Sequence, residues 1–244
     1  MQSQPDATRG FPQPQPPLAP PPRWRVLLEA QAAAELANLG LKYRELTRTR
    51  SEFTYPVILF PGFGTSERAL AFLSRYLKTV GAEVFDWGIG RNHGYVPDLL
   101  TQMLEQVRTL SRQLGTKLHL VGWSLGGYIA REVARDLPEL VEKVVTLGTP
   151  VVGGAKYTAI GAMYAQWGFD LDAMERDVAA REQNPIQNEI LAIYSKGDNI
   201  VSWQACIDDS SPRVRHLETT GSHLGLVVNA HAFEQIRSFL SLAN

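Results

Sequence analysis

The sequence predicts an α/β fold in which a mostly parallel sheet of about six strands carries helices on both faces. The chain has 244 residues, 44% of them hydrophobic, which is enough to bury the core of one domain. Short apolar runs alternate along it with longer segments of helical spacing. This alternation is typical of parallel strands joined by crossover helices.

The first 22 residues differ from the rest of the chain in composition. They hold eight of the fifteen prolines, which cannot donate backbone hydrogen bonds to a helix or sheet. We therefore expect residues 1–22 to be a disordered tail, with an SH3-type ligand as the alternative. Residues 23–244 are expected to form a single domain. It begins with an Ala/Leu-rich helix at 24–39, which Gly40 is expected to stop.

Strands and helices then alternate to the C-terminus. The first apolar run ends at Pro61-Gly62, which indicates a buried strand followed by a sharp turn. Ser66 is a candidate N-cap for the next helix. The predicted strands are 56–60, 83–87, 117–122, 144–147, 190–195 and 214–219. The later predicted helices are 66–80, 97–114, 126–137 and 230–242.

Composition excludes several classes of protein and site. Lys and Arg number 24 against 25 for Asp and Glu, so no basic field would attract nucleic acid. The single cysteine, Cys206, excludes an intramolecular disulfide and a cysteine-rich zinc site. No apolar run approaches the roughly 18 residues of a membrane helix, and no secretory leader is visible, so we expect a cytoplasmic protein without a transmembrane segment. No metal or cofactor is expected, and nothing indicates an oligomeric state.

The strongest chemical signal is Gly122-Trp123-Ser124-Leu125-Gly126, which fits the pattern G-x-S-x-G. An apolar strand precedes it and a helical pattern follows. A strand-to-helix turn this tight would hold Ser124 in a strained conformation at the carboxyl end of the sheet. The alternative is a glycine-rich turn with an incidental serine. We predict that Ser124 is a nucleophile.

A serine nucleophile needs a base and an acid that orients it, and on such a turn the chain order is Ser, acid, His. His223 lies in a Gly/Ser turn after the last predicted strand, whereas His216 falls inside that strand and His231 opens the last helix. We therefore predict His223 as the base. Asp198 follows the strand 190–195, where the acid is expected. Asp208 and Asp209 come next, in what looks like an ordinary solvated loop.

The tetrahedral intermediate of such a reaction needs two backbone N–H donors. One is expected from Leu125, directly after the serine. The second is expected from Phe63, which lies between two glycines after the first strand. A phosphate-binding function is not supported, because residues 88–94 have the spacing G-x-G-x-x-x-G and no G-x-x-x-x-G-K-[ST] occurs. We expect residues 88–94 to form a loop at the rim of the same cleft.

Residues 151–188 are longer than a connection between two strands requires, and we expect a lid there. Tyr157, Tyr164 and Trp167, together with Ile160, have the spacing of one stripe on a helix. The stripe predicts an acyl-binding surface above Ser124. The alternative is that these side chains only pack the segment onto the sheet.

These motifs together resemble the α/β-hydrolase superfamily: the Pro61-Gly62-Phe63-Gly64 turn, the elbow around Ser124, Gly197-Asp198 and Gly221-Ser222-His223. Leu147-Gly148-Thr149-Pro150 is similar to a stretch of bacterial lipases and lipase-like esterases. The resemblance implies a catalytic triad of Ser124, Asp198 and His223, with Phe63 and Leu125 at the oxyanion hole. The chain departs from lipases where they commonly have His-Gly at the first turn and His before the serine.

The function that follows is a carboxylesterase or lipase that acts on a small-molecule or lipid ester through an acyl-enzyme. The elbow also resembles acyl-carrier methyl-ester esterases and thioesterases, so an acyl thioesterase or acyl-carrier ester hydrolase is the alternative. A pseudo-hydrolase that binds a ligand without turnover is a third possibility, from a different class.

Overall fold

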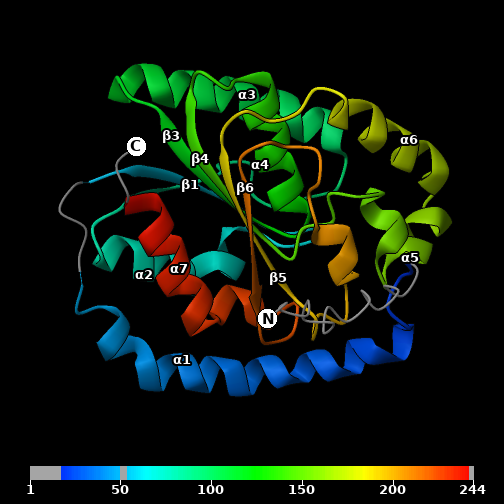
Figure 1. The fold of residues 1–244 in the computed structure, drawn as a ribbon, viewed down its shortest axis with the longest axis horizontal. Coiled ribbons are helices and arrows are strands. Elements are labelled where there is room, and N and C mark those ends of the chain that lie inside the picture. The colour runs from blue at the N-terminus through cyan, green and yellow to red at the C-terminus, as the bar shows by residue number, and fades with distance from the viewer. Residues whose placement is uncertain (1–17, 50–53, 242–244) are drawn as a thin grey trace, which may run out of the picture.

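The computed structural model describes residues 18–49 and 54–241 (Figure 1). Six strands form one parallel sheet in the order β2-β1-β3-β4-β5-β6. The strands are β1 (Pro56–Phe60), β2 (Glu83–Asp86), β3 (Leu118–Trp123), β4 (Val141–Leu147), β5 (Glu189–Ser195) and β6 (Val214–Thr219). The predicted fold class is confirmed. Most of the expected tail, residues 1–17, lies outside the described residues, and residues 18–22 belong to no helix or strand.

Seven α-helices connect and cover the strands in the described part of the chain. They are α1 (Ala32–Leu46), α2 (Ala71–Thr79), α3 (Val96–Leu114), α4 (Leu125–Asp136), α5 (Gly161–Gln166), α6 (Leu171–Glu182) and α7 (Ala230–Ser241). Five 3₁₀ segments add to them: η1 (Arg23–Gln31), η2 (Glu67–Leu70), η3 (Gly154–Tyr157), η4 (Trp203–Cys206) and η5 (Gly225–Val228). None of the described helices is both long and apolar enough to cross a membrane.

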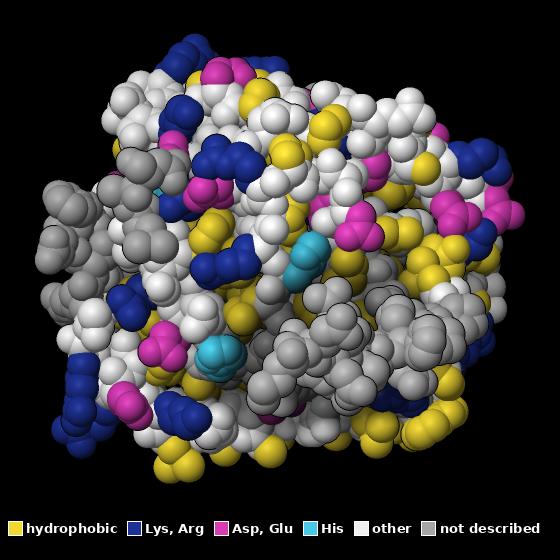
Figure 2. Space-filling model, viewed as in Figure 1, with side chains coloured by type: hydrophobic (Ala, Val, Ile, Leu, Met, Phe, Trp, Pro, Cys, Tyr) yellow, Lys and Arg dark blue, Asp and Glu magenta, His cyan; other side chains and the backbone are white. Residues whose placement is uncertain are grey.

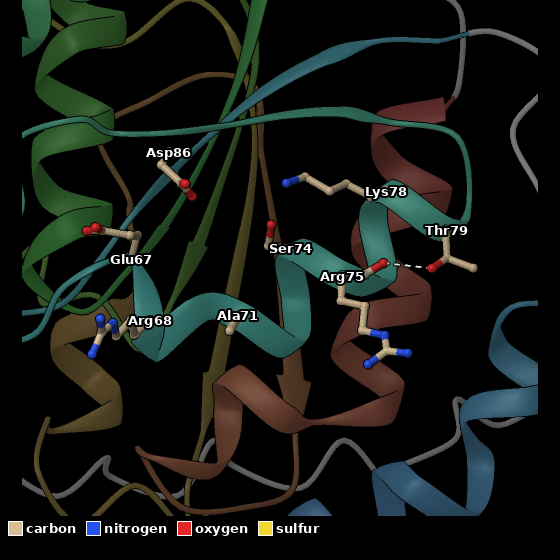
Figure 3. A pocket seen from close by; sticks show the side chains of 8 residues that line it. All are labelled: Glu67, Arg68, Ala71, Ser74, Arg75, Lys78, Thr79 and Asp86. Carbon is tan, nitrogen blue, oxygen red and sulfur yellow. Dashed lines mark hydrogen bonds between the residues drawn. The ribbon is translucent and has the colours of Figure 1, made fainter.

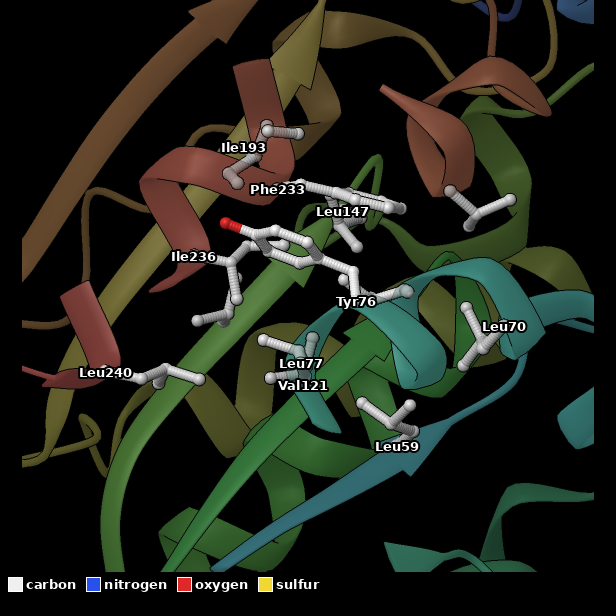
Figure 4. Packing of buried hydrophobic residues seen from close by; sticks show 14 of the residues in the cluster. Leu59, Leu70, Tyr76, Leu77, Val121, Leu147, Ile193, Phe233, Ile236 and Leu240 are labelled. Atoms are coloured by element: carbon white, nitrogen blue, oxygen red, sulfur yellow. The ribbon is translucent and has the colours of Figure 1, made fainter. Parts of the chain in front are cut away.

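Helices cover both faces of the sheet, and because successive strand residues point to opposite sides, each inner strand contributes to two cores. In β1, Val57 and Leu59 contribute to one core, whereas Ile58 and Phe60 contribute to the other. The first core is closed by α1, α2 and α7, and Figure 4 shows Tyr76 of α2 lying against the α7 side chains beside it. The second core is closed by α3 and α4.

The chain passes from β1 to β2 on one side and then returns to place β3 on the other side of β1. Connections therefore diverge between β1 and β3. In a parallel sheet, the crevice at the carboxyl ends of two such strands is where ligands bind. The turns that follow β1 and β3 hold Phe63 and Ser124, so both candidates lie at this crevice.

Several details of the predicted helices are wrong. Residues 23–31 form the 3₁₀ segment η1, so the first α-helix begins at Ala32, and the Ser66 side chain makes no capping hydrogen bond at η2. Gly40 does not stop the first helix, since α1 continues to Leu46. The residues beyond Gly40 include Tyr43 and Leu46, which pack against the core. The stripe from 157 to 167 does not lie on one helix. Thr158 has extended backbone and pairs with Val201 in an isolated bridge, which separates η3 from α5.

The N-terminal segment, η1 and α1, has an unusual distribution of side chains. Six of the eleven large hydrophobic side chains that are exposed among the described residues belong to it: Trp24, Val26, Leu27, Leu28, Leu36 and Leu41. Figure 2 shows hydrophobic atoms along the edge of the molecule where α1 runs. The buried residues are Glu29 in η1 and Leu39 in α1. The segment is therefore attached to the body partly through a carboxylate.

Candidate active site

The turn between β3 and α4 holds Ser124 in a strained conformation. Its backbone has φ 55° and ψ −127°, and it is the one non-glycine residue of the described chain with positive φ. A left-handed φ costs an L-residue free energy, and the surrounding structure has to impose it. The Ser124 N–H donates to the Leu147 carbonyl at 2.8 Å, and the Thr149 hydroxyl donates to the Ser124 carbonyl at 3.0 Å. Both ends of the residue are thus tied to the end of β4.

The glycines of this turn are there because nothing larger fits. A Cβ on Gly122 would lie 2.4 Å from the Gly127 Cα, and one on Gly126 would lie 2.3 Å from the Phe60 carbonyl oxygen. A Cβ on Gly127 would lie 2.0 Å from the Thr149 hydroxyl oxygen. The strand, the turn and the helix therefore approach more closely than side chains allow, which is what exposes the serine at the top of the sheet.

His223 and Asp198 are brought together from the loops that follow β6 and β5. The His223 Nδ1 lies 2.6 Å from the Asp198 Oδ2, and both side chains are almost fully buried. The other carboxylate oxygen, Oδ1, accepts the N–H groups of Ile200 at 2.9 Å and Val201 at 2.7 Å. The carboxylate is fixed by these bonds and can in turn fix the orientation of the imidazole.

Trp123 links this pair to the serine turn. Its indole N–H donates to the His223 carbonyl at 3.2 Å, and the two rings lie 5.3 Å apart between centroids. Among the described residues no hydrogen bond joins the Ser124 hydroxyl to His223. Catalytic hydrogen bonds of this kind often form only when substrate is bound. A role for Trp123 was missed in the sequence, where it appeared only as a departure from lipases.

The competing acid and the other histidines are engaged elsewhere. Asp208 accepts from the buried Arg131 guanidinium at 2.6 Å, and its N–H donates to the ring of His216 at 2.9 Å. Burial by itself raises the pKa of Asp208, but the Arg131 charge and the hydrogen bonds lower it more, leaving it well below its ordinary value. His119 lies in β3, and burial lowers its pKa to about 4, with the Lys143 charge as a second cause. Neither Asp208 nor His119 is positioned to serve Ser124.

The loop after β1 lies against the serine. A Cβ on Gly62 would be 3.3 Å from the Ser124 Cβ, so Phe63, the predicted oxyanion donor, belongs to a turn in contact with Ser124. Asn92, which the sequence analysis missed, holds this turn. Fully buried, it donates from Nδ2 to the Pro61 carbonyl at 2.8 Å, and its backbone carbonyl accepts the Gly64 N–H at 2.8 Å.

An apolar pocket of about 740 Å³ opens at Ser124. The expected rim loop contributes to it through Gly94, which confirms that prediction, and the segment 151–188 contributes Tyr164 and other side chains. Residues that line the pocket include Phe63, Leu100, Leu125, Ile160, Phe169 and Met174. Most of its exposed lining is carbon, so the pocket suits an acyl chain.

The three aromatic candidates of the insertion have different surroundings. Tyr164 is 4% exposed and lines the pocket, with its ring 5.0 Å from that of Phe63. Trp167 is 56% exposed and is not among the lining residues, although its ring lies 5.7 Å from that of Phe63. Tyr157 is not among the lining residues, because its hydroxyl is turned to Glu175 of α6, to which it donates at 2.7 Å.

Another hollow lies along η2 and α2 (Figure 3) and shares no lining residue with the pocket at Ser124. Its lining is largely charged or polar and includes Glu67, Arg68, Arg75, Lys78 and Asp86. It holds a serine, Ser74, but no histidine lines it. A nucleophile there would have no base, so the pocket at Ser124 is the candidate active site.

Comparison with known proteins agrees with the fold. The profile of the family described as palmitoyl protein thioesterase matches residues 56–199, more than half of the chain. The biotin biosynthesis bifunctional protein BioHC of Teredinibacter turnerae is 31% identical over 173 residues, which are 63% of this chain and 29% of that protein. This chain therefore spans less than a third of the length of that relative.

Two solved structures show the same fold. Est1E from Butyrivibrio proteoclasticus matches with a TM-score of 0.60 at 15% identity, covering 79% of this chain and 90% of that one. A monoacylglycerol lipase from Paleococcus ferrophilus matches with a TM-score of 0.58 at 18% identity, covering 79% and 95%. The resemblance expected from the motifs is confirmed: the chain has the α/β-hydrolase fold and belongs to the palmitoyl protein thioesterase family.

Proposed function

We propose that this protein is a serine hydrolase that cleaves carboxylic esters through an acyl-enzyme. The observation that carries the proposal is one arrangement. Ser124 stands on a strained turn at an apolar pocket, and its neighbour Trp123 donates to the carbonyl of His223, whose Nδ1 is 2.6 Å from Asp198. A strained serine, an oriented imidazole and a buried carboxylate are the parts that acyl transfer requires.

In the proposed reaction, His223 takes the Ser124 proton at Nε2 while the serine oxygen attacks the ester carbonyl. The backbone N–H groups of Phe63 and Leu125 donate to the oxyanion that forms. His223 then gives the proton to the leaving alcohol, which departs and leaves the acyl group on Ser124. Water, activated by the same imidazole, hydrolyses the acyl-enzyme and restores the serine. Asp198 holds the imidazole in the required tautomer throughout.

The pocket and the family support a hydrophobic acyl group. We propose that Tyr164 and the apolar lining receive the acyl chain, and that residues 151–188 act as a lid over it. A thioester substrate is the second candidate, favoured by the family match over residues 56–199, whose description names thioesterases. The chemistry at Ser124 is the same, with a thiol leaving in place of an alcohol.

The test combines a covalent probe with paired substrates. A fluorophosphonate should label Ser124, with Ser124→Ala unlabelled and His223→Ala labelled far more slowly. Hydrolysis of aryl esters of graded acyl length, and of acyl thioesters of the same lengths, should fall about 10⁴-fold in each single variant. The ratio of the two substrate series decides between ester and thioester. A wild-type protein that binds the acyl compounds but neither reacts nor hydrolyses would be a pseudo-hydrolase.

A further inference from the structure

The N-terminal segment, residues 23–46, precedes the region that matches the family, yet it reaches the loops of the proposed acid and base. Figure 1 shows α1 crossing the molecule next to α7, close to the chain that leaves β6. Two carboxylates of the segment, Glu29 and Glu35, point inward. Each of them accepts hydrogen bonds from residues that are between 170 and 195 positions away in the sequence.

Glu29 joins the two catalytic loops directly. It is 4% exposed. One oxygen, Oε1, accepts the His223 N–H at 3.1 Å and both the backbone and side-chain N–H groups of Asn199 at 3.1 Å. The other oxygen, Oε2, accepts the Leu224 N–H at 2.7 Å. Asn199 follows Asp198 and Leu224 follows His223, so a single side chain fixes the backbone on which the acid and the base stand.

Glu35 holds the preceding turn of the same histidine loop. Its Oε1 accepts the Ser222 N–H at 2.8 Å, and its Oε2 accepts the Ser222 hydroxyl at 2.9 Å. The carboxylate lies so close to the loop that a Cβ on Gly225 would be only 1.3 Å from Oε2. The glycine is therefore required by the glutamate. Ser222 passes the restraint on, because its hydroxyl accepts the Gly225 N–H at 3.0 Å.

Burying a carboxylate on folding costs free energy unless hydrogen-bond donors surround it. Here the donors that offset the cost are supplied by the two loops, and for Glu29 they come from both. If the purpose were only to attach η1 to the body, an apolar side chain would do so without this cost. The arrangement makes sense when the position of the loops themselves matters.

We propose that Glu29, supported by Glu35, is a positioning residue for the Asp198–His223 pair, and that residues 23–46 are part of the active site. The inference rests on the proposed function, because it supposes that this pair serves Ser124. Glu29 touches neither the substrate nor the imidazole ring atoms that carry the proton. It acts through the backbone of both loops.

The test is Glu29→Gln, which keeps the shape and one acceptor but turns an N–H donor toward a loop N–H. We expect kcat to fall about 10–100-fold with KM changed less than about threefold, since an error of about 1 Å in a catalytic group costs up to 10²-fold. Glu29→Asp, which keeps the charge, should retain more activity than Glu29→Ala. Glu35→Gln should show a smaller loss, and the exposed Glu45→Gln of the same helix should behave as wild type.

Hydrogen exchange in the segments 197–201 and 220–226 gives a readout that does not depend on activity. Both segments should exchange faster in Glu29→Gln while the protein remains folded by circular dichroism. If Glu29→Gln keeps wild-type kcat and exchange, or loses thermal stability with kcat unchanged well below its Tm, the proposal is wrong. Should wild type itself fail to react with the fluorophosphonate, the proposed function fails, whereas unchanged exchange in the variant refutes the role of Glu29 alone.

Discussion

Ser124 is positioned by close packing of backbone on backbone around its turn, whereas the loops of the proposed acid and base, Asp198 and His223, are held by hydrogen bonds to two carboxylates of the N-terminal segment. On the serine side, Gly122, Gly126 and Gly127 let strand, turn and helix meet at distances that exclude a Cβ. On the acid–base side, Glu29 and Glu35 accept hydrogen bonds from loops more than 160 residues away.

This difference predicts how the serine turn and the loops of Asp198 and His223 respond to substitution. Close packing of backbone on backbone has no slack, because adding one methyl group forces atoms within their contact distance. Hydrogen bonds to a carboxylate can be lost one at a time, and each loss relaxes a loop without displacing the core. The serine side should therefore fail abruptly when altered and the acid–base side by degrees, and the predictions below test this.

The largest effect is expected from Gly127→Ala on the serine side. The added methyl would meet the Thr149 hydroxyl and the Gly122 carbonyl, so the elbow must open. We expect a loss of about 3 kcal/mol in the free energy of unfolding and at least about a 100-fold loss in kcat/KM. Urea unfolding and steady-state kinetics measure the two effects.

Gly40→Ala is the matched control for that variant. Gly40 lies within α1, and a Cβ there would meet nothing within 4 Å. Alanine should therefore stabilise the protein by about 0.5–1 kcal/mol through helix propensity and leave kcat/KM unchanged. Wild-type activity in Gly127→Ala would show that the serine turn is less tightly determined than its contacts indicate.

An intermediate effect concerns His119, an ionisable group inside β3, the strand that leads to Ser124. Its folded pKa is about 4, below the ordinary value of a histidine in an unfolded chain, which is about 6.5. The unfolded state therefore binds more protons between these values, and the protein should lose stability as the pH falls through this window, by up to about 3 kcal/mol. Above about pH 6.5 His119 is neutral in both the folded and the unfolded chain, so it no longer makes the free energy of unfolding depend on pH.

His119→Leu removes the titrating group and should flatten the stability profile between about pH 6.5 and pH 4. Urea unfolding at several pH values measures this. An unchanged slope in His119→Leu would mean that the acid sensitivity of the fold arises from other groups.

The smallest effect is expected from a substitution in the lining of the pocket. Tyr164→Ala should enlarge the pocket, and Tyr164 belongs neither to the serine turn nor to the loops of Asp198 and His223. The preferred acyl length should shift, with a change in discrimination of about 1–3 kcal/mol, while short esters remain substrates. Trp167→Ala should shift the preferred acyl length less, because Trp167 is largely exposed. If Tyr164→Ala lowers Tm and leaves the acyl-length profile as it was, the side chain is core.

The local pattern of the chain was enough to predict the sheet and its strand positions. The four inner strands are largely apolar runs buried on both faces, and such runs are visible without any knowledge of partners. The strained serine turn was equally predictable, because the glycines and the serine that form it are neighbours in sequence. Helix ends were less so: Gly40 looks like a stop, but tertiary packing of Tyr43 and Leu46 extends α1 past it.

Only the tertiary structure decided what surrounds the site. Sequence position favoured Asp198 over Asp208. The structure shows the physical difference between them: Asp198 contacts the His223 ring, whereas Asp208 is paired with Arg131. Glu29 was invisible in the sequence, because a glutamate within a helical pattern resembles any solvated one. Its burial depends on donors from the opposite end of the chain, and such long-range pairing leaves no local pattern. Interactions between residues that are close in sequence can be predicted from its local pattern, whereas interactions between distant residues form only when the chain folds.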